Sequence, residues 1–413
     1  MKSSEQNSSS RLLTVTIVVF LFSAFFLLTI KEFSIFSISM TFFVPAIFFV
    51  STVFLPRIFS ADRLMLSIVN FLCALGVLIL YRMSPKQGLN QAINYGIGLI
   101  AMLFFIYFVR LMQRKKPVII LLIAVSAILM VLPLIFGTER NGARAWVTLF
   151  GLGFQPSELV KVLMLIIEAY FLSKRKIFSA ALYAGFCMLV LMLQKDLGTA
   201  LIYYGVILVM VYVATRNYLY MGLGFVGAVF GSVIGYKMFS HVKRRVAIWI
   251  NPWIDYEGAG YQIVQSLIAI VNGGVWGTGL GLGNSYVIPA HTTDFIFSII
   301  INEFGMIFGL CILFMYILLF LRGINIALRS NSRFNAILAL GSSVLIALQT
   351  FIIIGGNIKM IPLTGVTLPF ISYGGSSLLS SMCIMGIIQG VASINDTQVQ
   401  EDKELAQLQG DLL

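Results

Sequence analysis

Residues 289–321, "PAHTTDFIFSIIINEFGMIFGLCILFMYILLFL", carry a polar loop directly into an apolar run. The run from 294 to 321 exceeds the roughly 20 residues that an α-helix needs to cross a bilayer. Comparable runs lie at 12–30, 38–55, 63–81, 91–109, 117–136, 158–173, 177–194, 197–215, 219–239, 335–356 and 373–392. The sequence therefore predicts an all-α polytopic membrane protein with twelve membrane-spanning helices.

Composition supports this class, because only 11% of the residues are charged, against about 25% in soluble domains. The net charge of +12 is concentrated in short loops, which favours orientation in the bilayer over nucleic-acid binding. The basic motifs "RLMQRKK" (110–116) and "SKRK" (173–176) fall on one predicted side, which we take as cytoplasmic together with both termini. The loops 137–157 and 240–293 then face the other side.

The single carboxylate at the edge of the opening stretch, Asp294, has two explanations. It either performs chemistry, or it is favoured by the dipole at a helix N-terminus with Thr292 or Thr293 as the cap. Glu303 lies nine residues further on, about 13–14 Å and half a turn away along a helix. The two carboxylates therefore cannot form the pair about 5 Å apart that a retaining glycosidase needs.

A second group of ionisable residues starts in "QPSELVK" (155–161), where Pro156 suits a helix start. Glu158 and Lys161 stand three apart on one helix face, and Asp196 opens a later helix at the same predicted membrane level. We expect a mutually neutralising Glu158–Lys161–Asp196 cluster. A structural clamp and a direct catalytic role are both compatible with it.

The remaining polar motifs and the cysteines give weaker signals. "HVKRR" (241–245) is either an anion-binding patch or a solvated loop, and the run 277–283, with glycine at every second position, predicts flexible turns. Two histidines are too few for a metal cage. The four cysteines stand singly in apolar segments, which predicts buried structural thiols: Cys73, Cys187, Cys311 and Cys383.

Five motifs taken together resemble the RodA/FtsW/SpoVE family, also called SEDS proteins, over residues 63–392. They are "RAWVTLFGLGFQPSELVK" (144–161), "QKDLGTA" (194–200), the segment 244–283, "HTTDFIFSIIINEFG" (291–305) and "GVTLPFISYGGSS" (365–377). The resemblance implies a ten-helix body that polymerises lipid II outside the bacterial cytoplasmic membrane beside a class B penicillin-binding protein. It also implies a divalent cation, Mg²⁺ or Mn²⁺, and no organic cofactor.

The resemblance assigns residue roles as well. Asp294 matches the aspartate of the family's "TDF" motif and is expected to be the general base for the acceptor sugar's 4-hydroxyl, with inversion at the anomeric carbon. Glu158, Lys161 and Asp196 match the family's ionisable positions. The candidates for binding the substrate's pyrophosphate or sugar are Arg144, Gln155, Lys243, Arg244, Arg245 and Ser372.

Five departures from the family pattern and two rival functions accompany this interpretation. Lys195 replaces a usual proline, Pro289 and Asn302 stand where acids are usual, and Thr293 is an additional residue before Asp294. Two additional N-terminal helices (12–55) are expected at the periphery of the body. The expected division is 1–62, an N-terminal tail with those helices; 63–392, the catalytic membrane domain; and 393–413, a mobile cytoplasmic tail. The rival functions are a lipid II flippase or transporter and a non-catalytic scaffold for the penicillin-binding protein.

Overall fold

The computed structural model describes residues 2–31, 33–59, 61–112, 116–140, 142–149, 152–283 and 288–410. All twelve predicted segments are α-helices: α1 (Lys2–Lys31), α2 (Ile35–Val53), α4 (Arg63–Met83), α5 (Pro85–Met112), α6 (Lys116–Phe136), α7 (Pro156–Ser173), α8 (Ile177–Leu193), α9 (Leu197–Thr215), α10 (Tyr218–Met238), α13 (Ile296–Leu328), α14 (Arg333–Asn357) and α15 (Gly375–Gly410). A short helix, α3 (Leu55–Phe59), leads from α2 toward α4. Residues 113–115 of the basic motif at 110–116 lie outside the described residues.

Among the described residues, ten helices are long and apolar enough to cross a membrane. The two other predicted spans are α7, which carries Glu158, Lys161 and Glu168, and α8, which has 17 residues. The protein is therefore a multi-pass membrane protein. In α7 the ionisable side chains are buried inside the bundle, which is where a bilayer tolerates them.

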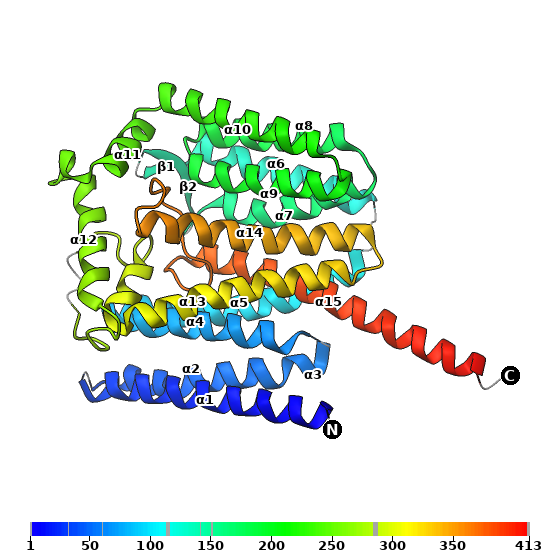
Figure 1. Ribbon diagram of the computed structural model, residues 1–413, viewed down its shortest axis with the longest axis horizontal. Helices are drawn as coiled ribbons and strands as arrows, with labels where there is room; N and C mark the ends of the chain where they lie inside the picture. The colour runs from blue at the N-terminus through cyan, green and yellow to red at the C-terminus, as the bar shows by residue number, and fades with distance from the viewer. Residues whose placement is uncertain are drawn as a thin grey trace.

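The long helices run roughly side by side, with α1 and α2 along one edge of the bundle and α8 and α10 along the opposite edge (Figure 1). Burial differs between the middle of the bundle and its edge: 94% of the apolar span of α4 is buried, whereas none of the apolar span of α10 is buried. Lipid tails are as apolar as leucine, so an apolar residue needs no burial here. The small residues and polar groups at the centre therefore determine which helices pack together.

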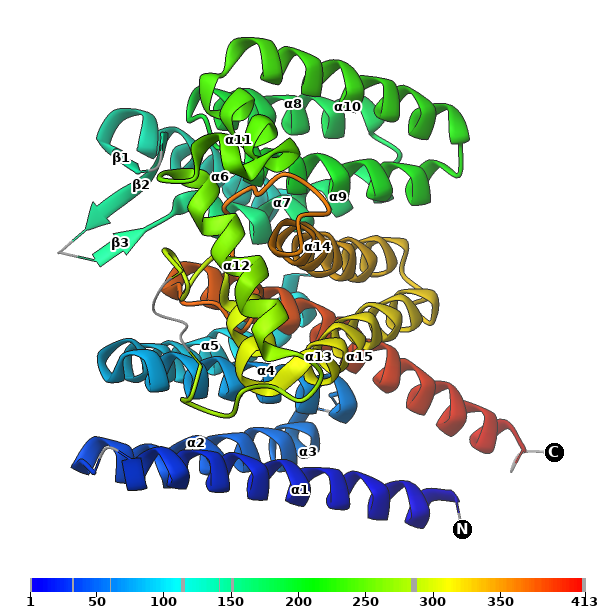
Figure 2. The same ribbon diagram turned by 60° about the vertical axis from the view of Figure 1, so that its left-hand side comes forward.

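Both long loops contain regular structure, which the sequence did not predict. Residues 138–154 form an antiparallel sheet of β1 (Thr138–Arg140), β2 (Ala143–Leu149) and β3 (Leu152–Phe154). The other loop contains α11 (Ser240–Ile250), the 3₁₀ helix η1 (Pro252–Asp255) and α12 (Ala259–Gly273). In Figure 2, α12 lies across the ends of the long helices. We call this end of the bundle, with β1–β3, α11, α12 and Asp294, the loop end.

Residues 280–282 of the glycine run form a turn, as predicted, and its first part is held by backbone hydrogen bonds. The backbone N–H groups of Thr278 and Gly279 donate to the carbonyl oxygens of Asn302 and Glu303 in α13. Gly305 interrupts α13 with φ 87° and ψ 168°, and a Cβ on Gly277 would stand 2.3 Å from the Glu303 carbonyl oxygen. The glycines are therefore required because two backbones meet at the break.

The described part of the segment expected as a mobile tail continues α15 as a helix to Gly410, and its mobility stays a prediction. One smaller expectation fails for a cysteine. Cys311 is exposed on α13, whereas Cys73, Cys187 and Cys383 are buried as predicted. Cys311 lies in an apolar helix that faces outward at this position, and sequence alone does not distinguish a lipid-facing thiol from a core thiol.

Candidate functional site

Asp294 lies in the tight turn that precedes α13. The backbone N–H of Asp294 donates to the carbonyl oxygen of Ala290, which adopts the left-handed conformation with φ 53°. The residue at the N-cap of α13 is Phe295, and no side chain caps the helix there. A cap from Thr292 or Thr293 therefore does not match the geometry. Asp294 lies one residue before the N-cap, where the helix dipole still favours a carboxylate.

Polar contacts from two other segments, the end of α14 and the segment between α14 and α15, hold this turn. Asn357, at the end of α14, donates its amide to the Asp294 carbonyl oxygen at 2.7 Å. Ser372 donates to the Thr293 carbonyl oxygen at 2.7 Å, and the N–H of Tyr373 donates to the Thr292 carbonyl oxygen. Ser372 is buried and also accepts a bond from the N–H of Leu368. The geometry therefore gives Ser372 a positioning role instead of the predicted contact with substrate.

Arg245 approaches Asp294 from α11 on the other side of Gly365. A Cβ placed on Gly365 would stand 3.5 Å from Nη2 of Arg245 and 3.7 Å from Oδ2 of Asp294; within the described chain no other heavy atom would lie inside 4 Å. Gly365 has φ +75°, a conformation that other residues rarely adopt. Nη1 of Arg245 donates to the Thr364 carbonyl oxygen at 2.9 Å. A carboxylate and a guanidinium therefore both lie within contact distance of the position that a Cβ at residue 365 would occupy.

The environment changes the acidity of this carboxyl group. Burial raises the pKa of Asp294 from 3.8 to about 6, against the opposing effects of the Thr293 hydroxyl and the Arg245 guanidinium. A group with a pKa near the working pH is well suited to accept a proton. The site can therefore activate a hydroxyl group at Asp294 while Arg245 faces the negative charge of the reactants.

The three basic residues at 243–245 do not form one patch, and the predicted contacts of Lys243 and Arg244 with substrate stay predictions. Consecutive residues on a helix point in different directions. Arg245, with Ile248 and Trp249, forms the inward face of α11, and the Trp249 indole donates to the Lys359 carbonyl oxygen. Arg244 instead pairs with Asp255 in η1 at 2.5 Å, largely in solvent, and Lys243 is exposed.

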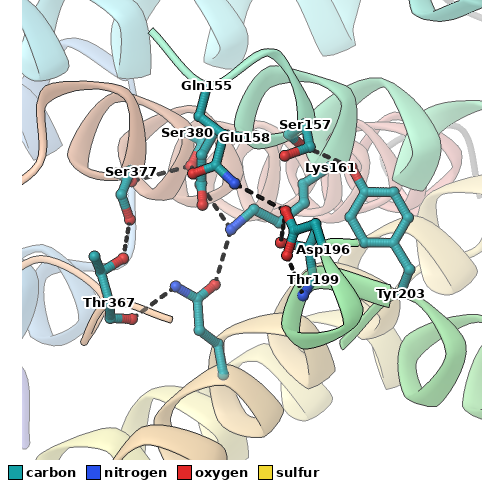
Figure 3. Close-up of polar contacts among 11 residues, drawn as sticks. Gln155, Ser157, Glu158, Lys161, Asp196, Thr199, Tyr203, Thr367, Ser377 and Ser380 are labelled. Carbon is teal, nitrogen blue, oxygen red and sulfur yellow. Dashed lines mark hydrogen bonds and ion pairs between the residues drawn. The ribbon is translucent and has the colours of Figure 1, made fainter. Parts of the chain in front are cut away.

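The predicted pair of Glu158 and Lys161 exists, within a network that extends further than the sequence suggested (Figure 3). Nζ of Lys161 lies 2.6 Å from Oε2 of Glu158 and donates to Oε1 of Gln349 in α14 at 3.1 Å. Ser380 of α15 donates to the same Glu158 oxygen at 2.7 Å. The ion pair is buried at both ends, so it links α7 to α14 and α15.

The network also reaches the segment that holds Asp294. The amide nitrogen of Gln349 donates to the Thr367 carbonyl oxygen at 2.8 Å, and the Thr367 hydroxyl lies 2.5 Å from that of Ser377. Thr367 and Ser372 belong to one segment between α14 and α15, whose other end contacts the turn that contains Asp294. A polar path therefore connects the Lys161 ammonium to the backbone beside Asp294.

Asp196 forms no direct ion pair with Lys161 among the described residues, but the charge of Lys161 lowers the pKa of Asp196 and that of Glu158 raises it, as expected for the predicted cluster. Its carboxylate caps α9 by accepting from the N–H and hydroxyl of Thr199. Gln155 donates to it at 3.0 Å, as Figure 3 shows. Burial raises the pKa of Asp196, opposed by its bonds to Thr199. Gln155 and Asp196 thus join the starts of α7 and α9.

Arg144 has a structural use in the sheet. Its Nε donates to the Gly137 carbonyl oxygen at 3.0 Å, and its backbone N–H donates to the Gln194 carbonyl oxygen. The cation therefore lies just beyond the C-terminus of α6, where the helix dipole favours positive charge. The predicted contact of Arg144 with substrate is untested.

The described residues do not form a metal centre of their own. Within those ranges no three His, Cys, Asp or Glu side chains come close enough to hold an ion. Mg²⁺ commonly uses one or two carboxylates plus substrate phosphates, and the carboxylate beside Arg245 is the one at this site. A dedicated protein cage for the predicted cation therefore does not fit.

The contacts that carry most of the positioning were not identified from the sequence. Asn357, Gln349 and Gly365 each come from a segment remote from Asp294 in the chain. The signals that could have indicated them are an amide inside the apolar helix 335–356, an asparagine directly after the glycines of "IIIGGN", and a glycine that opens a polar segment.

Comparison with known proteins places this geometry in context. A family model for FtsW, RodA and SpoVE, described as a cell cycle protein, matches residues 62–397. The chain is 38% identical over 275 residues to the peptidoglycan glycosyltransferase RodA of Mycobacterium tuberculosis. The matched region covers 62% of this chain and 59% of the relative. The chain thus spans under two thirds of that relative. It is 34% identical to stage V sporulation protein E of Bacillus subtilis, covering 81% of this chain and 97% of the relative.

Solved structures agree with the fold. A chain of a peptidoglycan synthase complex, described as coordinating polymerization and crosslinking, superposes with a TM-score of 0.68 and 26% identity over 81% of this chain and 98% of that chain. The rod shape determining protein RodA of Thermus thermophilus gives a TM-score of 0.61 at 26% identity, covering 82% and 98% of the two chains. In both cases nearly the whole of the solved chain is matched.

Proposed function

The chain belongs to the FtsW, RodA and SpoVE family of cell cycle proteins, and we propose that it is a peptidoglycan glycosyltransferase that polymerises lipid II. The Mycobacterium tuberculosis relative is named a peptidoglycan glycosyltransferase. The single observation that supports the proposal most is that Asp294 and Arg245 both border Gly365, where the Arg245 charge lowers the pKa of Asp294. This places a carboxylate whose pKa is about 6 beside a fixed cation at one end of a membrane bundle.

The reaction joins an acceptor hydroxyl to an anomeric carbon. Asp294 accepts the proton from the 4-hydroxyl of the acceptor sugar as the oxygen attacks the anomeric carbon of the donor, and the bond to the pyrophosphate breaks with its electron pair. The configuration inverts, so one base is sufficient and no covalent intermediate forms. Arg245 stabilises the departing negative charge through a charge-assisted contact.

The segments around the site maintain this arrangement. Asn357 and Ser372 fix the backbone of the catalytic turn, and the Glu158–Lys161 pair fixes the segment that carries Ser372 through Gln349 and Thr367. We assign Asn357, Ser372, Glu158 and Lys161 to positioning of the turn that contains Asp294. A divalent cation, Mg²⁺ or Mn²⁺, remains part of the proposal as a companion of the substrate's pyrophosphate.

The proposed setting is the bacterial cytoplasmic membrane, with both termini in the cytoplasm and the loop end outside. A class B penicillin-binding protein is the proposed partner. The structural relative assigned to a peptidoglycan synthase complex supports this partner. The excess of Lys and Arg in loops at the other end supports the orientation.

The decisive assay incubates purified full-length protein with labelled lipid II and Mg²⁺, with and without the partner. The parent is expected to make glycan polymer, and Asp294→Asn to make none. Asp255→Asn is the matched control, because it removes an aspartate from the same end of the protein outside the site, and it should retain activity. A parent that reorients lipid II across vesicles without polymerising it would indicate a flippase. Polymer made only by the partner would indicate a scaffold.

A further inference from the structure

A cavity of about 470 Å³ lies between α1, α4 and α13, far from the catalytic turn. Its wall is apolar, and α13 contributes Cys311, the exposed cysteine. The residues that define the three sides are Leu13 and Ile17 of α1, Ile68 and Phe71 of α4, and Leu310 and Phe314 of α13.

A second cavity of about 550 Å³ adjoins the first and has a different character. Its lining includes three arginines, Arg11, Arg57 and Arg63, together with Thr14 and Thr52. Ser67 of α4 lines both cavities, so the two cavities meet at this residue. Arg11, Arg57 and Arg63 are exposed.

The depth of the combined cavity matches one leaflet of a membrane. Arg63 and Phe71 are eight residues apart on α4, which corresponds to about 12 Å of helix. Half of a hydrocarbon core is about 15 Å. The arginines therefore lie at the level of the lipid headgroups when the apolar part lies among the acyl chains.

The arginines lie at the end of the bundle opposite the loop end. Arg82, near the last residue of α4, pairs with Glu303 close to the start of α13 at 2.9 Å, so these two helices are antiparallel. Arg63 opens α4 and is thus remote from Asp294, which precedes α13. The neighbouring acid, Asp62, caps the N–H of Met65, faces Arg322 at 3.6 Å and lines neither cavity.

We propose that the two cavities form one binding site for an anionic phospholipid. Its phosphate contacts Arg11, Arg57 and Arg63, and one acyl chain lies in the apolar cavity between α1, α4 and α13. Guanidinium groups suit phosphate oxygens because their donors are planar and permanently charged. Basic pockets between membrane helices are a recognised mode of binding acidic headgroups. The lipid would join the α1–α2 pair to the rest of the bundle.

Native mass spectrometry of the full-length protein, exchanged into phosphatidylglycerol or phosphatidylcholine, tests the headgroup. The parent should retain phosphatidylglycerol more than tenfold better. Each arginine near an acidic headgroup contributes roughly a fivefold effect, so Arg11→Gln with Arg57→Gln should reduce retention about 25-fold. The matched control is Arg175→Gln with Lys176→Gln, which removes the same charge from the exposed loop after α7 and should change nothing.

Cys311 provides a separate test of the apolar half. Because the other three cysteines are buried, N-ethylmaleimide should modify Cys311 first, and phosphatidylglycerol should slow that reaction where phosphatidylcholine and inorganic phosphate do not. Leu310→Trp, at an exposed position on the cavity wall, should reduce lipid retention with all arginines intact.

Three outcomes would overturn the proposal. They are equal retention of the two lipids by the parent, undiminished retention in the double arginine variant, and protection of Cys311 that requires a partner protein. The last result would assign the apolar cavity to a partner helix. Melting temperatures of the variants, compared with the parent, separate loss of binding from loss of folding.

Discussion

Replacing Asp294 with asparagine should abolish polymerisation and, at neutral pH, make the protein more stable. Burial raises the pKa of Asp294 from 3.8 to about 6, so at neutral pH the carboxylate is ionised in both states but is less well solvated in the native state. The shift corresponds to about 3 kcal/mol of unfavourable free energy once the group is ionised in both states. Because the side chain is only partly buried by area, we expect about 1–3 kcal/mol to be recovered in the variant.

The sign of the effect fixes its pH dependence. The penalty is complete above pH 6, where native Asp294 is ionised, and disappears below pH 3.8, where both states are protonated. Thermal unfolding in detergent at pH 8 should therefore show Asp294→Asn melting at least about 2 °C above the parent, with the difference shrinking as the pH falls through 6. Asp255→Asn, which breaks a largely exposed ion pair, should change little. An equal or lower melting temperature for Asp294→Asn at pH 8 would refute the reasoning.

The remaining predictions concern the same site and its supports. Polymerisation by the parent should rise with pH around 6 as Asp294 becomes ionised, and Arg245→Gln should move that midpoint upward because the Arg245 charge lowers the pKa; an unchanged midpoint would contradict the contact. Lys161→Ala leaves Glu158 buried without its cation and should cost about 3–5 kcal/mol, whereas Glu158→Gln with Lys161→Met should melt close to the parent; equal melting of all three would remove the clamp. Gly365→Val should abolish activity by filling the space between Arg245 and Asp294. Gly274→Val, also at positive φ but with open space around its Cβ position, is the control, and similar activity losses in both would attribute the effect to backbone strain. Deletion of residues 1–61 should leave polymerisation detectable, although the bond from Lys31 to the Gly281 carbonyl oxygen is lost; an inactive but well-folded truncation would count against the peripheral role of these helices.

The sequence by itself determined the class of protein and the number of long helices. Each apolar run is a local property of the chain, and a backbone in lipid must bond within its own helix. The same is true of the pair Glu158 and Lys161, because a spacing of three residues brings two side chains together on any helix. The isolation of Asp294 from Glu303 also followed from helix geometry alone.

The tertiary structure decided which remote groups meet those residues. Arg245, Asn357 and Gly365 converge on Asp294 from segments that are 49 residues or more away in sequence on one side and 63 or more on the other. Helix periodicity contains no information about such distances. Of the three basic residues at 243–245, only the direction in which α11 packs selects Arg245, since each successive residue turns about 100° around the axis. Polar contacts in a membrane protein thus specify the assembly of the helices, because burial of apolar surface cannot distinguish protein from lipid.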